Sequence, residues 1–162
     1  MNHFFSNYDD NDDFNEKISL DELYDRKHEV EVNRMNIYGN GVDIIKNSRI
    51  KKSIKNKDFI NRIYTKHEIN QSKKIKNKVN FFAKRFAAKE AFAKSIGTGF
   101  RNNLNFKDIE ILNDKLGKPF YHNTKKISLI IKKKFKVKKY DLFLSISDEK
   151  DYSIAFTILQ VQ

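Results

Sequence analysis

The segment over residues 77–96 constrains the fold more than any other part of the chain. Phe82, Phe86 and Glu90 recur at four-residue spacing, so on a helix they share one face that carries two aromatic rings and then a carboxylate. Gly97 follows the segment, and glycine commonly ends a helix. We therefore expect one long helix whose aromatic face packs against the rest of the domain.

The carboxylate on this face has two possible explanations. Glu90 and Lys94 are four residues apart, and on a solvated helix such a pair contributes only about 0.3–0.5 kcal/mol. Alternatively, a carboxylate that continues an apolar face is costly unless it is paired or binds a metal, and three basic side chains surround it in the sequence, Arg85, Lys89 and Lys94. The segment alone leaves both explanations open.

A second motif, Gly39-Asn40-Gly41-Val42-Asp43, lies in a strand-like run. Glycines inside a strand permit a close backbone approach or a bulge, and Asp43 then stands where a strand end can aim it into a cleft. The motif lacks the third glycine and the helix opening of a dinucleotide fingerprint, so we reject that function. An ordinary turn aspartate remains the alternative.

The remaining patterns predict a single α+β domain. Thr65 with Glu68 forms a capping box that opens a helix to about residue 74, and Leu142, Leu144 and Ile146 alternate as in a half-buried strand. We expect strands over 36–45, 104–112, 119–121, 141–147 and 152–161, and helices near 49 and over 65–74, 77–96 and 124–135. The last two strands should form an antiparallel hairpin.

Charge divides the chain into two parts. Residues 1–34 hold ten acidic and four basic side chains, a net charge of −6, whereas residues 35–162 carry +18, which together give the formal +12. We expect residues 1–34 to be a disordered or loosely attached leader, or an upstream mis-start, and residues 35–162 to be the folded domain. A short helix over 18–27 is the alternative. The chain has no cysteine, no apolar run of membrane-spanning length and no signal peptide at its start.

The basic domain requires an explanation in terms of partners. Lysines cluster over 51–57, 73–78 and 132–139, a distribution that can indicate nucleic-acid binding. No base-stacking platform or recognition motif accompanies these clusters, so we do not expect nucleic acid as the partner, and the lack of a long apolar run argues against a membrane. An acidic protein or an anionic ligand would be attracted by the same field, and a merely solvated surface stays possible.

Six motifs in order resemble a known family. They are Gly39-Asn40-Gly41-Val42-Asp43-Ile44 followed by Arg49-Ile50, the Phe59 to Glu68 stretch, Arg85-Phe86-Ala87-Ala88-Lys89-Glu90-Ala91, Phe106 to Ile111, Gly117-Lys118-Pro119, and Ser145-Ile146-Ser147. Over residues 36–160 the chain resembles holo-acyl-carrier-protein synthase, the small trimeric class of phosphopantetheinyl transferase. The resemblance implies an antiparallel sheet packed on a long central helix, and a homotrimer.

The resemblance also implies a reaction. Such an enzyme transfers 4'-phosphopantetheine from coenzyme A to a serine of apo acyl carrier protein, in cytoplasmic fatty acid biosynthesis, and leaves adenosine 3',5'-bisphosphate. Asp43 and Glu90 match the family's ligands for Mg²⁺, which prefers oxygen ligands. A carboxylate or a water on the metal could take the serine proton, and Lys94 could neutralise the developing charge or protonate the departing phosphate.

Secondary roles follow from the same resemblance. Arg85 and Lys89 would contact phosphates, Gly117-Lys118-Pro119 would lie along coenzyme A, and Arg49 would bind the acidic recognition helix of the carrier protein. Each has a simpler explanation: exposed helix charges for the first two, an ordinary turn for the loop, and a solvated charge for Arg49.

One residue departs from the family pattern. Asp148 follows Ser145-Ile146-Ser147, where the family commonly has a histidine near the nucleotide phosphates. An acid there should weaken the phosphate contact, unless it pairs with a neighbouring lysine or Glu149 or Lys150 fills the position instead. We expect no histidine-based metal site, because His67 and His122 have no partner spacing.

Overall fold

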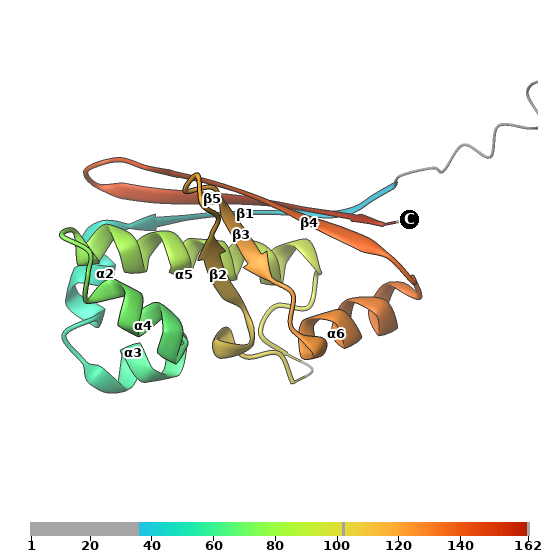
Figure 1. Ribbon diagram of the computed structural model, residues 1–162, viewed down its shortest axis with the longest axis horizontal. Helices are drawn as coiled ribbons and strands as arrows, with labels where there is room; N and C mark the ends of the chain where they lie inside the picture. The colour runs from blue at the N-terminus through green and yellow to red at the C-terminus, as the bar shows by residue number, and fades with distance from the viewer. Residues whose placement is uncertain (1–35, 102, 162) are drawn as a thin grey trace, which may run out of the picture. The chain divides into compact units, whose positions relative to one another are not determined.

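The computed structural model describes residues 36–101 and 103–161, and these form an α+β domain (Figure 1). The predicted leader over 1–34 lies outside the described residues, so the domain boundary stays a prediction. The described part follows the order of elements expected from the sequence, with one additional helix and one element that differs. In this part of the chain no helix is long and apolar enough to cross a bilayer.

A three-stranded antiparallel sheet forms one layer. It consists of β1 (Asn36–Lys46), β5 (Tyr152–Val161) and β4 (Tyr140–Asp148), in that spatial order. The β4–β5 hairpin is the one predicted, and its register pairs Ser145 with Phe156, which in turn pairs with Val42 of β1. Side chains alternate across the sheet, so one face turns inward and the other outward.

The long helix α5 (Lys78–Ser95) lies against the inner face of this sheet (Figure 1). The side chain of Asn77 caps its start by accepting the amide N–H of Asn80, and Gly97 follows its end with φ of 65°, in the left-handed region that favours glycine. Phe82 is buried and Phe86 is partly buried, so the predicted aromatic face packs as expected. The prediction of a central helix is confirmed.

The two glycines of β1 explain how closely α5 approaches the sheet. A Cβ at Gly39 would come within 1.9 Å of the Ser95 carbonyl oxygen, and one at Gly41 within 2.0 Å of the Ala91 carbonyl oxygen. Any side chain there would force the helix off the strand. Of the two alternatives predicted for this motif, the close approach is confirmed, and the strand also has an irregular register between Ile37 and Gly39.

Three short helices flank one end of α5: α2 (Asn47–Ser53), α3 (Lys57–Ile63) and α4 (Lys66–Ser72). The capping box predicted at Thr65 and Glu68 is confirmed, because each side chain accepts the other residue's backbone N–H. The sequence analysis missed α3, which has only seven residues and begins after an Asn56 cap.

A small second sheet pairs β2 (Glu110–Asn113) with β3 (Pro119–His122), and α6 (Lys125–Phe135) follows it. The strand expected over 104–112 is wrong in its first half, where the chain forms the 3-10 turn η1 (Phe106–Asp108). The Phe106 ring stacks on Phe86 and Phe100, and the Lys89 ammonium donates to the carbonyls of Phe106 and Ile109. These contacts hold the backbone of this segment in a turn instead of an extended strand. Those tertiary contacts outweigh the local strand pattern.

Candidate functional site

The close packing of β1 on α5 brings two carboxylates together. Asp43 lies two residues beyond Gly41 on the inward face of β1, and Glu90 precedes Ala91, the residue that Gly41 touches. Burial raises the pKa of Glu90, the charge of Asp43 raises it further, and the charge of Lys94 partly opposes both. Two segments separated by almost fifty residues therefore supply one acidic pair.

Lys94 completes this cluster. Its ammonium lies 2.9 Å from Asp43 Oδ1 and donates to the carbonyl of Val42 at 2.8 Å. The ion pair therefore runs from helix to strand rather than to Glu90, one turn away on the same helix. The Lys94 side chain is 52% exposed while that of Asp43 is 16% exposed, so the cluster opens to solvent on the lysine side.

The donor set suits a hard divalent cation. Mg²⁺ typically takes one or two protein carboxylates and completes its shell with waters and substrate phosphates. Asp43 and Glu90 supply two carboxylates, and burial, followed by the charge of Asp43, raises the pKa of Glu90, so a cation held by both would favour its ionised form. Among residues 36–101 and 103–161, no group of three or more histidine, cysteine, aspartate or glutamate side chains is arranged around one point, which leaves this pair as the metal candidate.

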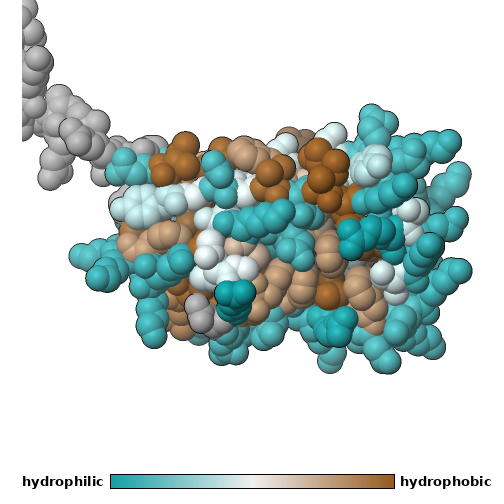
Figure 2. Space-filling view, turned by 180° about the vertical axis from the view of Figure 1, so that it is seen from behind, coloured by the Kyte–Doolittle hydropathy of each residue, from teal (hydrophilic) through white to brown (hydrophobic). Residues whose placement is uncertain are grey.

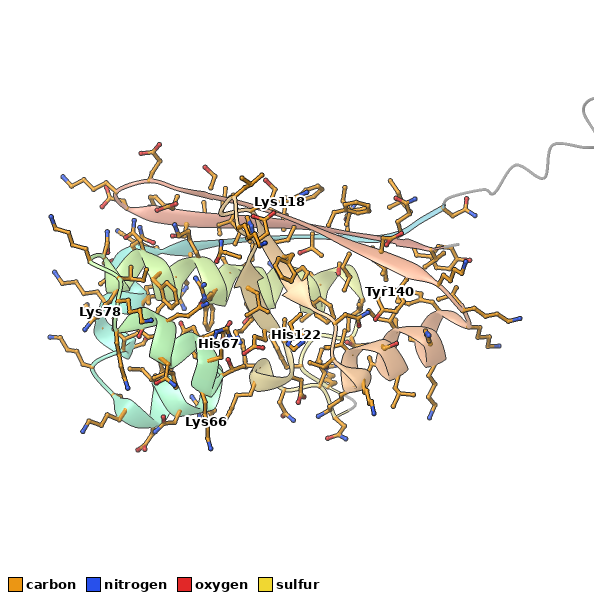
Figure 3. The ribbon with its side chains drawn as sticks, in the orientation of Figure 1. Lys66, His67, Lys78, Lys118, His122 and Tyr140 are labelled. Carbon is orange, nitrogen blue, oxygen red and sulfur yellow. The ribbon has the colours of Figure 1, made fainter. Side chains whose placement is uncertain are left out.

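A groove of about 640 Å³ runs beside the first half of α5. The β2–β3 turn and the end of β4 form its other walls, so it gathers Arg85, Gly117 and Pro119, three of the residues predicted to bind the cofactor. Lys118 lies at the tip of the same turn, which reaches toward the large sheet (Figure 3). The backbone N–H of Lys118 donates to Asp114, an arrangement that fixes the turn and leaves the ammonium exposed.

Arg85 is an unusual cation within this groove. The residue is 5% exposed, its guanidinium lies over the Phe81 ring, and Nη2 donates to the side-chain oxygens of Gln71 and Asn113 at 3.1 and 3.2 Å. Its buried Nε has no hydrogen-bond partner among the described residues. Burial lowers the pKa of Arg85 to about 10 against the opposing charge of Glu68, so the group stays protonated at neutral pH. A charged donor with spare capacity suits an anionic ligand.

Lys89 does not take the role expected of it. Its ammonium is fully buried, pairs with Glu68 Oε2 at 2.8 Å and donates to the carbonyls of Phe106 and Ile109. These three partners use all three of its donors. The prediction that Lys89 contacts a phosphate is therefore wrong in this structure: the side chain ties α5 to α4 and to the chain before β2.

Asp148 pairs with a lysine, which is one of the alternatives considered in the sequence analysis. Its two oxygens accept from Lys84 Nζ and from Asn80 Nδ2, both at 3.0 Å. Burial alone would raise the pKa of Asp148, but the hydrogen bonds from Asn80 and Lys84 and the charge of Lys84 lower it overall. Asp148 is thus an ion-pair partner of Lys84 on the wall of the groove.

Arg49 lies on the exposed side of α2. Ile50 beside it is buried and anchors the helix, which turns the basic residues of α2 outward. A hollow of about 330 Å³ between α2 and α3 is lined by two cations, Lys52 and Arg62, and one carboxylate, Asp58, together with Phe59. This end of the domain therefore presents a basic surface with an aromatic side chain in it.

The sequence analysis missed a cluster centred on Glu110. His122 Nδ1 lies 2.9 Å from Glu110 Oε2, His67 Nδ1 lies 3.6 Å from Oε1, and the Thr65 hydroxyl donates to Oε1 at 2.6 Å. The two histidines come from α4 and β3 and lie near each other beside α5 (Figure 3). Their separation of 55 positions hides this cluster from any analysis of local spacing.

The chain is similar to proteins of a known family. A family model described as the 4'-phosphopantetheinyl transferase superfamily matches residues 39–157. The holo-acyl-carrier-protein synthase of Pelagibacter ubique (strain HTCC1062) is 61% identical over 126 residues, which cover 78% of this chain and 98% of that protein.

Solved structures agree with the sequence relatives. The holo-acyl-carrier-protein synthase of Neisseria meningitidis superposes with a TM-score of 0.69 at 39% identity, covering 76% of this chain and 98% of that one. The Bacillus anthracis structure, solved in complex with CoA (3',5'-ADP), gives a TM-score of 0.66 at 36% identity, covering 79% of this chain and 99% of that one. These matches extend over the α+β domain, whose predicted fold they confirm.

Proposed function

Because this chain belongs to the 4'-phosphopantetheinyl transferase superfamily, and within it to the holo-acyl-carrier-protein synthases, we propose that it transfers 4'-phosphopantetheine from coenzyme A to a serine of an apo acyl carrier protein. The observation that carries the proposal is the convergence of Asp43, Glu90 and Lys94 from β1 and α5. The products would be holo carrier protein and adenosine 3',5'-bisphosphate. Fatty acid biosynthesis in the cytoplasm is the setting we propose for it.

Asp43 and Glu90 would hold Mg²⁺. Bound there, the cation would offset the charge of the pyrophosphate that the serine attacks. One of these two carboxylates would accept the serine proton. The exposed ammonium of Lys94 can turn toward the leaving phosphate and neutralise its charge.

The groove beside α5 would bind coenzyme A. Arg85 supplies a buried, protonated guanidinium, and Gly117 and Pro119 of the Gly117-Lys118-Pro119 turn line the same groove. The Bacillus anthracis relative was crystallised with CoA (3',5'-ADP), which supports a nucleotide as the ligand of this family. Gly117 has φ of 87°, a conformation that a larger residue would strain, so the turn depends on glycine.

The basic end of the domain would bind the carrier protein. Arg49 on α2, with Lys52 and Arg62 around the neighbouring hollow, would meet an acidic helix, and the aromatic ring of Phe59 would cover apolar side chains beside it. Charge complementarity of this kind chiefly raises the association rate and is weakened by salt.

We further propose that the outer face of the large sheet forms a homotrimer interface. Alternation places five large apolar side chains on this face with exposed fractions of 39–57%: Val42, Ile44, Phe143, Ile154 and Phe156. Hydrophobic residues gather along the upper rim in Figure 2, where the sheet lies. An apolar patch of this kind marks an association surface. Light scattering should give three times the 19.2 kDa chain mass, and a monomer under active conditions would refute the trimer.

One experiment tests the central proposal. The protein is incubated with apo acyl carrier protein, coenzyme A and Mg²⁺, and the carrier is weighed by mass spectrometry. We expect a gain of one phosphopantetheine group that is lost with a chelator and restored by added Mg²⁺. Binding of coenzyme A without any gain in mass would instead indicate a family member that binds without turnover.

A further inference from the structure

The Lys84–Asp148 pair stands on the wall of the proposed nucleotide groove but has no part in the chemistry described so far. Lys84 is next to Arg85 on α5, and Asp148 is the last residue of β4. The ammonium lies 3.0 Å from Asp148 Oδ1, and Asn80 donates to the other oxygen at 3.0 Å. All three side chains line the groove.

The groove has an excess of positive charge. Its described lining includes three cations, Lys74, Lys84 and Arg85, and one carboxylate, Asp148. Asp148 is therefore the single negative group among the lining residues, and it is bound to the cation nearest to it. A phosphate that enters this groove meets two lysines and an arginine, with one carboxylate competing for them.

The pair is exposed enough to exchange partners. The side chains of Lys84 and Asp148 are 33% and 29% exposed, and ion pairs at such positions are weak because water screens them. A phosphate carries more negative charge than a carboxylate and offers more acceptor oxygens, so it can displace Asp148 from Lys84. Asp148 would keep its hydrogen bond from Asn80 after the exchange, which prevents the hairpin from losing its anchor.

Resting on the proposed function, we propose that Lys84 is a phosphate-binding residue for coenzyme A and that Asp148 is an internal competitor for it. In the free protein Asp148 occupies the ammonium and lowers the affinity of the groove for the nucleotide. When the nucleotide binds, Lys84 moves from the carboxylate to a phosphate. Asp148 thus lowers the affinity of the groove for the nucleotide and eases release of adenosine 3',5'-bisphosphate.

A double-mutant cycle tests this by calorimetric titration of coenzyme A into the full chain, with wild type, Asp148→Asn, Lys84→Ala and the double variant. Asp148→Asn should tighten coenzyme A binding by about 2- to 5-fold, and Lys84→Ala should weaken it by a similar factor, as expected for one partly exposed charge contact. In the Lys84→Ala background, Asp148→Asn should change the affinity by less than about 2-fold, because the ammonium for which Asp148 and the phosphate compete is absent.

A matched control is available in the same domain. Asp108 pairs with Lys126 at 2.6 Å, with side-chain exposures of 19% and 38%, and neither residue lines the groove. Asp108→Asn removes the same charge from a comparable pair, so it should leave the affinity for coenzyme A within about 1.5-fold of wild type. An equal tightening in Asp108→Asn and Asp148→Asn would show a general field effect and overturn the proposal.

Other outcomes also decide the matter. Unchanged or weaker binding in Asp148→Asn, or the same tightening with and without Lys84, would overturn the competition. Circular dichroism checks the fold of each variant, and Asp148→Ser serves in place of the asparagine variant if that one is unfolded. If the wild-type protein binds coenzyme A and modifies the carrier but the double-mutant cycle gives none of the expected changes, only this inference is refuted. A wild type that does neither refutes the proposed function, and the inference with it.

Discussion

Lys89 and Lys94 lie five positions apart on α5, both were expected in the site, and their surroundings could hardly differ more. The Lys89 ammonium is fully buried against Glu68, whereas the Lys94 side chain is 52% exposed and bound to Asp43. Five residues turn a helix by about 140°, so one lysine faces the interior and the other the mouth of the cluster. A basic residue beside a catalytic motif therefore carries chemistry only if the helix phase turns it toward the substrate.

The two ion pairs also differ in what they contribute. Burial lowers the pKa of Lys89, with the charge and hydrogen bond of Glu68 opposing that shift, which is the signature of an ammonium held in the interior. A buried pair is not strongly stabilising compared with apolar side chains, but the loss of one partner is costly. An exposed pair such as Lys94–Asp43 can be broken cheaply and is free to change partners.

The largest effect on stability should come from Lys89→Met. It leaves Glu68 buried without its counter-ion, and we expect the free energy of unfolding to fall by about 3–5 kcal/mol, measured by urea denaturation. Lys94→Met should lower it by less than about 1 kcal/mol.

The pair Lys89→Met with Glu68→Gln supplies the control. Removal of both charges should recover part of the lost stability, because no uncompensated carboxylate remains in the interior. If Lys89→Met and Lys94→Met destabilised the protein equally, the distinction between the two lysines would be wrong.

The largest effect on activity should come from the two carboxylates of the proposed metal site. Glu90→Gln and Asp43→Asn keep the shape of each side chain and remove its charge, so we expect turnover to fall by at least about 100-fold with the fold intact. Lys94→Ala should chiefly lower turnover, and the affinity for the carrier protein should change little. Carrier modification followed by mass spectrometry at several Mg²⁺ concentrations checks this, and near-normal turnover of either carboxylate variant at low Mg²⁺ would exclude the metal site.

The contrast between these lysines also shows where sequence reasoning succeeds. The helix start at Asn77, the capping box at Thr65 and the glycines at 39 and 41 depend on contacts within a few residues or on a backbone requirement that only glycine meets. These local features were predictable. Asp43 and Glu90 could be brought together only through the family resemblance, because their approach depends on how β1 packs against α5.

The misses have a common physical origin. Lys89 and Glu90 are neighbours in the sequence but point in directions about 100° apart on a helix, so a motif that surrounds Glu90 with basic residues does not surround it in space. The turn at Phe106 and the histidines around Glu110 depend on contacts between distant segments. The local hydrophobic periodicity of the sequence does not predict such contacts.

Glu110 provides an intermediate case between a buried and an exposed charge. Burial would raise its pKa, but hydrogen bonds from Thr65 and His122 and the charges of His67 and His122 lower it overall. A carboxyl whose pKa is lower in the folded state contributes stability above its unfolded pKa, near 4.3, and loses that contribution as the pH falls through the folded value.

We therefore expect Glu110→Gln to lower the free energy of unfolding by about 1 kcal/mol at pH 7. The difference from wild type should shrink as the pH falls below 4 and vanish once the carboxyl is protonated in both states. Urea denaturation at several pH values measures it, and Glu149→Gln, at an exposed carboxylate, controls for the loss of one negative charge. A constant difference at every pH would mean that the ionised form of Glu110 has no special role.

The smallest effect should follow deletion of residues 1–34, which removes a net charge of −6 and tests whether exposed and buried cations respond differently to its loss. The leader carries −6 against +18 on the rest of the chain, so its loss should slightly strengthen the attraction of an acidic carrier for exposed residues such as Arg49. We expect the Michaelis constant for the carrier to change by no more than a few-fold, and the change to fade at high salt, where charges separated by more than a Debye length are screened. Stability should not change, because Lys89 and Glu68 are shielded inside the domain.

Steady-state kinetics at low and high salt, with thermal denaturation of both chains, makes the comparison. A collapse in activity or in the melting temperature after deletion would show that the leader is a structural part of the domain.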